Sequence, residues 1–193
     1  GNCLIHAYDV DILVPADAPI LEVKPPEVTE VTRQVAENIA ALIEDGSTIE
    51  VGIGRIPQAL LGFLKDKKDL GLHTEMITDG VIDLIECGAI TGARKTLDRG
   101  KVVASFCLGT KRLYDYVDNN PVFSFQPTEY VNNPSIITQQ NKMVAINMAL
   151  EIDLTGQVCA DSLGSKFFSG VGGQVDFNRG AAKAPGGKAI IAV

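Results

Sequence analysis

Apolar positions recur with two different periods along this chain, and the two periods predict helices and strands in turn. Between positions 29 and 45 they recur every three or four residues, which is typical of a helix with one buried face. Thr29 suits the N-cap of this helix, and Asp45-Gly46 supplies a glycine for its end. Further helices are predicted from Pro57 to position 64, at 81–87 and at 111–117.

Short apolar runs between these helices predict strands, at 48–51, 70–74, 101–107, 121–125 and 188–193. From 144 to 154 apolar residues alternate with others without a break, so we expect a strand with one packed and one polar face. Thr155-Gly156 then predicts a hairpin, whereas 130–134 reads as a polar loop. Because strands and helices alternate, we expect an α/β fold with a mixed sheet flanked by helices.

The ends of the chain suggest a piece of a longer polypeptide. Residues 2–14 alternate like one or two short strands, and we interpret residues 1–14 as the end of a preceding domain. Residues 15–28 hold four prolines and read as a linker, since proline excludes long helices. Residues 29–193 would form the main domain, which closes on an apolar run without a tail.

Composition limits the function classes. The net charge of −7 argues against binding a nucleic-acid backbone, although local backbone N–H groups could still hold an anionic ligand. No run of 18 apolar residues is present, so no membrane span is predicted. The four cysteines form no C-x-x-C pair, and with two histidines we expect no metal site and a reducing, cytoplasmic setting.

Glu75 is the residue that we expect to perform covalent chemistry. It lies in the stretch GLHTEMITDG, between an apolar approach and Met76-Ile77, where partial loss of water would strengthen a carboxylate as a nucleophile. The alternative is a solvent-exposed carboxylate at a strand end, as most are. His73 points to the same side of a continuing strand, where it either orients the carboxylate or has a structural role, the latter being favoured.

Two glycine-rich turns could supply backbone N–H groups to that carboxylate. Gly52-Ile53-Gly54 follows a strand and precedes a helix, a layout that presents N–H groups to an anion. A dinucleotide-binding fold is an alternative for this turn, but the third glycine of that motif is absent. The second turn spans 170–173 and could equally be a structural connection.

Five motifs in one order resemble the acetyl-CoA hydrolase/transferase family, namely VGIGRIP, GLHTEMITDGVIDLIE, YVNNP, DLTGQVCADS and SGVGGQVDFNRGA. Within it the likeness is strongest to CoA-transferases acting on 4-hydroxybutyrate or on butyryl-CoA and acetate. The resemblance implies a two-domain protein, of which this chain would be most of the C-terminal domain. It also implies a homodimer.

The resemblance assigns roles to residues of this chain. It implies that Glu75 is the nucleophile. It also implies that the two glycine turns, together with single residues elsewhere, bind coenzyme A and stabilise the oxyanion. The implied oxyanion and coenzyme A contacts are Gly52, Ile53, Gly54, Arg55, Ile56, Asn147, Gly170, Gly172, Gly173 and Lys188.

The implied activity is exchange of coenzyme A between short-chain carboxylic acids, with 4-hydroxybutyryl-CoA and acetate as first choice, through a glutamyl-CoA thioester. Coenzyme A is then a substrate, and no tightly bound cofactor is expected. Butyryl-CoA:acetate exchange and acyl-CoA hydrolysis on the same scaffold remain open. A non-catalytic nucleotide-binding module is the alternative from another class.

Overall fold

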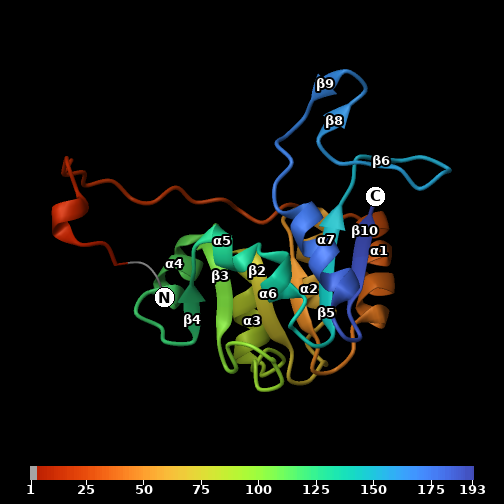
Figure 1. Ribbon diagram of the computed structural model, residues 1–193, viewed down its shortest axis with the longest axis horizontal. Helices are drawn as coiled ribbons and strands as arrows, with labels where there is room; N and C mark the ends of the chain where they lie inside the picture. Colours follow the sequence, from red (N-terminus) through yellow and green to blue (C-terminus); the bar gives the residue numbers. More distant parts are fainter. Residues whose placement is uncertain (1–3) are drawn as a thin grey trace.

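A computed structural model describes residues 4–193, and its body is one six-stranded parallel sheet with helices on both faces (Figure 1). The strand order is β10-β5-β1-β2-β3-β4. These strands are β1 (Thr48–Val51), β2 (Gly71–Ile77), β3 (Val102–Cys107), β4 (Phe123–Phe125), β5 (Met143–Met148) and β10 (Lys188–Ala192).

The helices are α1 (Glu30–Leu42), α2 (Arg55–Gly62), α3 (Gly80–Glu86), α4 (Lys111–Val117), α5 (Thr128–Val131), α6 (Pro134–Ile137) and α7 (Gln174–Lys183), preceded by the 3-10 turn η1 (Ala7–Asp9). α1 precedes the first strand, and the other helices lie in the connections between consecutive strands of the sheet, as crossovers between parallel strands require. None of the helices within residues 4–193 is long and apolar enough to cross a membrane.

Each face of the sheet has its own apolar core. One core joins α1, α2 and α3 to the sheet through buried residues such as Ile39, Leu60 and Leu84. The other joins α5, α6 and α7 to the opposite face through residues such as Val131 and Phe177. Burial on both faces explains the mainly apolar sequences of β3 and β5.

Two small hairpins lie outside the sheet and project from the body (Figure 1). The first pairs β6 (Glu151–Ile152) with β7 (Val158–Cys159), and the second pairs β8 (Ser162–Leu163) with β9 (Lys166–Phe167), both antiparallel. The predicted hairpin at Thr155-Gly156 is the tip of the first. The chain then returns to the body through the glycine turn at 170–173.

The predicted α/β class is confirmed, and the expected mixed sheet needs one correction. All pairings in the six-stranded sheet are parallel, because each strand is reached by a crossover, and antiparallel pairing is confined to the hairpins. The predicted strand at 144–154 is also divided. β5 ends at Met148, and its first four residues are buried on both faces instead of one.

Three other local predictions were wrong. Residues 130–134 are not a simple loop, since α5 ends at Val131 and α6 begins at Pro134. The predicted strands at 2–14 are absent from residues 4–14, which hold only η1 and are mostly exposed, and residues 2 and 3 lie outside the described residues. α2 begins at Arg55, before Pro57, because Gly54 occupies its N-cap.

Candidate active site

The carboxyl ends of β1, β2 and β5 meet at a cavity of about 350 Å³, which we call the site cavity. β1 lies between β2 and β5, at the point where the strand order reverses. Ligands of open parallel sheets bind in this position, because the connecting turns diverge there. Of the residues predicted from sequence, the site cavity brings together Glu75, Gly52, Ile53, Asn147, Gly170, Gly172 and Gly173.

Glu75 is half-buried on β2, in the interior of the sheet. A Cβ atom built on Gly173 would lie 2.5 Å from Glu75 Oε2 and 2.5 Å from Asn132 Nδ2. A side chain at position 173 would therefore displace the Glu75 carboxyl group or the Asn132 amide. Glu75 also lines a second, more open hollow with Asn132 and Asp176, so its carboxyl group is accessible from two sides.

Both glycine turns lead into helices, and the start of α7, at Gly173 and Gln174, lines the site cavity. Gly173 is the N-cap of α7 and Gly54 the N-cap of α2, and neither has a side chain to occupy the free backbone N–H groups. Gly54 adopts φ 125°, a conformation that favours glycine. Unoccupied N–H groups at helix N-termini attract negative charge, so the cavity has donors placed for an oxyanion.

Four predicted contacts lie outside the site cavity. Gly54 lines a neighbouring hollow beneath the linker, beside Pro25 and Pro26. Arg55 is exposed, and Ile56 is buried in the apolar core.

Lys188 is the fourth of these contacts. It is the first residue of β10, so it lies at the amino ends of the strands, opposite the site cavity. Its Nζ donates to the Leu42 carbonyl at 2.8 Å and to Glu44 Oε1 at 3.0 Å. The structure therefore does not bring Lys188 to Glu75.

Glu50 is a second carboxyl group of the site cavity, and the sequence analysis missed it. Only 3% of Glu50 is exposed, and its Oε2 accepts hydrogen bonds of 3.0 Å from the Ile146 N–H and from Asn147 Nδ2. Burial raises the pKa of Glu50 to about 8, against the effect of these two hydrogen bonds, and the nearby Glu75 raises it further. Glu50 is therefore mostly neutral at pH 7.

His73 does not contact Glu75 but supports a neighbouring helix. It is fully buried, and its Nε2 lies 2.8 Å from the Val131 carbonyl. Burial lowers the pKa of His73 to about 4, so the ring is neutral and Nε2–H donates to that carbonyl. Since Asn132 follows Val131, this bond places the Asn132 amide beside Glu75. The structural role, favoured from sequence, agrees with this geometry.

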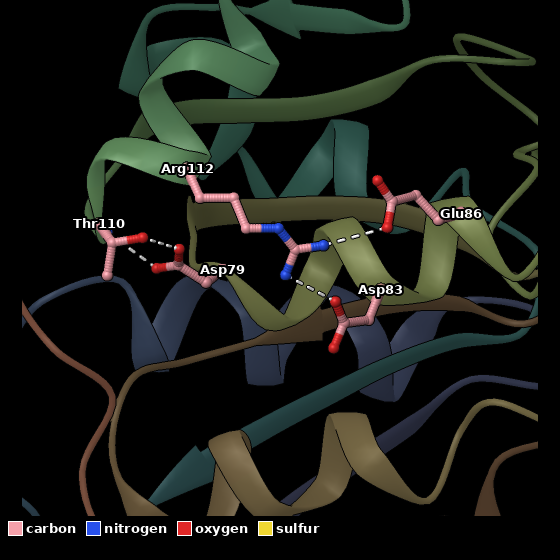
Figure 2. A network of polar contacts seen from close by, with 5 residues as sticks. All are labelled: Asp79, Asp83, Glu86, Thr110 and Arg112. Atoms are coloured by element: carbon pink, nitrogen blue, oxygen red, sulfur yellow. Dashed lines mark hydrogen bonds and ion pairs between the residues drawn. The ribbon is translucent and has the colours of Figure 1, made fainter.

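Asp79 supports the turn that follows β2 (Figure 2). Its carboxylate accepts hydrogen bonds from the Thr110 hydroxyl and from the Thr110 N–H, the latter at 2.9 Å, which joins the ends of β2 and β3. Arg112 pairs in the same region with Asp83 and Glu86 of α3, but all three side chains are exposed. We therefore expect Asp79 to stabilise this turn more than the ion pairs do.

Comparison with known proteins gives consistent matches. Residues 109–193 match the family described as the acetyl-CoA hydrolase/transferase C-terminal domain. The whole chain is 52% identical to a protein of Clostridium kluyveri named 4-hydroxybutyrate coenzyme A transferase, of which it covers 45%. It is 47% identical to a protein of Fasciola hepatica named succinyl-CoA:acetate/propanoyl-CoA:succinate CoA transferase, of which it covers 41%.

A solved structure agrees with these relatives. The crystal structure of a 4-hydroxybutyrate CoA-transferase from Porphyromonas gingivalis superimposes on 98% of this chain with a TM-score of 0.87 and 44% identity. This chain covers 45% of that structure, so it spans less than half the length of its relatives. The matches confirm the resemblance to the acetyl-CoA hydrolase/transferase family: residues 109–193 match that family's C-terminal domain, and the whole chain is similar to named CoA-transferases over less than half of their length.

Proposed function

We propose that this chain is the catalytic half of a CoA-transferase that exchanges coenzyme A between short-chain carboxylic acids. Glu75 is the nucleophile of this proposal. The observation that carries it is the position of Glu75, half-buried on an interior strand with the Gly173 backbone against its Oε2. The likeness to several CoA-transferases adds support.

The first half-reaction forms a covalent intermediate. The Glu75 carboxylate attacks the thioester carbonyl of an acyl-CoA, and the C–S bond breaks to give a mixed anhydride and the CoA thiolate. The thiolate then attacks the glutamyl carbonyl, which releases the first carboxylate and leaves a glutamyl-CoA thioester. Dividing the exchange in this way replaces one difficult step with easier ones.

The second half-reaction reverses these steps with a new acid. Its carboxylate attacks the glutamyl thioester, and the released thiolate then attacks the new acyl carbonyl to give the product acyl-CoA and free Glu75. Every step passes through a tetrahedral oxyanion. The backbone N–H groups of Ile53 and Gly173 are the donors that we assign to it, and one such donor contributes about 3 to 4 kcal/mol.

We infer 4-hydroxybutyryl-CoA and acetate as the first-choice pair, following the relative that is 52% identical. Relatives named for other acids are nearly as similar. We therefore infer that the shape of the pocket, and not Glu75, determines which acid is accepted. The remaining part of the longer protein would complete that pocket. We also propose that the full-length protein forms a homodimer and that a preceding domain ends at residue 14.

A chemical trap tests the nucleophile. Full-length protein is incubated with acyl-CoA, reduced with borohydride and digested, and the peptide masses are measured by mass spectrometry. The Glu75 peptide is expected to carry an alcohol in place of its carboxyl group, because borohydride reduces a thioester. Glu75→Gln should abolish the change, and Glu86→Gln, on the exposed side of α3, should not. Reduction of a different acid would move the nucleophile elsewhere.

A second measurement separates transfer from hydrolysis, which one similar protein of Candida albicans, named acetyl-CoA hydrolase, brings into question. Release of free coenzyme A is followed with and without an acceptor acid. Transfer requires that acyl-CoA consumption depends on the acceptor. Full-rate release of coenzyme A in its absence would show that water is the acceptor.

A further inference from the structure

Glu50 is a buried acid that the proposed mechanism does not use. It lies on β1, next to the strand that holds Glu75, and both residues line the site cavity. Buried carboxyl groups are rare unless they are paired with a cation. Among residues 4–193 no cationic side chain acts on this one. Its two hydrogen bonds come from an uncharged N–H and an uncharged amide.

The hydrogen bonds show which oxygen carries the proton of the neutral acid. Oε2 accepts from both Ile146 N–H and Asn147 Nδ2, so it is the carbonyl oxygen of the acid. Within residues 4–193 no protein group is hydrogen-bonded to Oε1 of Glu50. The proton therefore lies on Oε1, and Glu50 contributes to the cavity an O–H group without a protein acceptor.

We infer that Glu50 is a ligand-binding residue whose neutral side chain donates a hydrogen bond from Oε1 to a carboxylate oxygen of the acid that enters the site cavity. This inference rests on the proposed CoA-transfer. A neutral donor suits that site, because the incoming acid is itself a carboxylate when it attacks the uncharged glutamyl thioester. An ionised Glu50 would repel that carboxylate and could donate nothing.

The other groups around Glu50 leave this assignment intact. On the same face of β2 lie Glu75, which is the other titratable residue of the site cavity, and His73, which is neutral because its pKa is lowered to about 4. β5 contributes the uncharged Asn147, and the loop before α7 contributes the uncharged Ser169 and Gln174. Ionisation of Glu50 above neutral pH is thus the change that removes the donor.

Two substitutions separate the donor from the negative charge. Glu50→Gln keeps an acceptor for the two N–H groups and offers an N–H donor to the cavity at every pH. Glu50→Leu removes both. The kcat and KM of full-length protein for the acceptor acid are measured from pH 6.5 to 9 for each variant, at saturating acyl-CoA.

The ratio of kcat/KM of Glu50→Gln to that of the unmodified protein is expected to rise about tenfold between pH 7 and pH 9, since a pKa of about 8 leaves roughly one tenth of Glu50 neutral at pH 9. Glu50→Leu should raise KM for the acid by roughly 10- to 100-fold at pH 7, as expected for a lost hydrogen bond to a charged group. A ratio that stays constant with pH would overturn the inference.

Infrared spectroscopy gives a readout that does not depend on activity. The unmodified protein should show a protonated carboxyl band at pH 7 that fades as the pH rises to 9, and Glu50→Gln should lack it. Absence of this band in the unmodified protein would overturn the inference. Borohydride labelling of Glu75 is run in parallel: labelling with a flat pH ratio refutes only the role of Glu50, whereas no labelling in any variant refutes the CoA-transfer itself.

Discussion

Replacing Glu50 with glutamine is expected to change how the stability of the protein depends on pH. The pKa of Glu50 is about 8 in the folded chain and 4.5 in an unfolded one. The folded state therefore binds this proton more tightly. The stability linked to Glu50 is fully present below about pH 4.5 and is lost as the pH rises towards 8. Glutamine does not titrate and removes this loss.

The size of the effect follows from the pKa difference. One pKa unit corresponds to about 1.4 kcal/mol. Because only 3% of Glu50 is exposed, solvent screening reduces this little. Between pH 5 and pH 7.5 the free energy of unfolding of Glu50→Gln should rise by about 3 kcal/mol relative to that of the unmodified protein.

Urea unfolding of the full-length protein, followed by circular dichroism at several pH values, measures this difference. Glu37→Gln on the exposed face of α1 is the matched control, because it makes the same chemical change without the burial. A difference between Glu50→Gln and the unmodified protein that stays constant from pH 5 to 7.5 would refute the reasoning.

Three further predictions concern the support of the site. Gly173→Ala should lower kcat/KM at least tenfold, because its Cβ would meet the Glu75 carboxyl group, whereas Gly62→Ala in α2, with no atom within 4 Å of its Cβ, should not. Asp79→Asn should lower the free energy of unfolding by about 1 to 3 kcal/mol, and Arg112→Ala by less than about 1 kcal/mol, both measured by urea unfolding. The unmodified protein should lose stability as the pH falls from 6.5 to about 4, because the buried His73 ring must stay neutral. His73→Phe should remove this pH-dependent loss. Thermal unfolding at pH 4.5 and 7 tests this.

Most of the regular elements could be predicted from sequence, because each has a strong local pattern. The strand at 48–51 and the helix at 111–117 match β1 and α4. The ends of other elements moved by one to three residues, as with β2, which continues past Thr74 to Ile77. The short helices α5 and α6 carry no periodicity, since each has four residues, and they were missed.

The candidate site was predictable where it depends on strand ends. Gly52 and Glu75 both lie near the carboxyl ends of parallel strands, and such ends meet at one edge of a sheet. The same rule would have excluded Lys188, which is the first residue of its strand and therefore lies at the amino ends of the strands. Glu50 was missed because one acid in the sequence TIEV reads as exposed, and only the pairing of β1 between two strands shows its burial.

β2 is paired along both edges, whereas the glycine turn at 170–173 is the returning end of an arm that leaves the body after Met148 (Figure 1). Glu75, the nucleophile that we propose, is therefore held in place by strands on both sides, and we expect adjustment to different acyl chains to involve the arm. We expect substitutions within residues 150–172 to change which acids are accepted without changing the strands that hold Glu75.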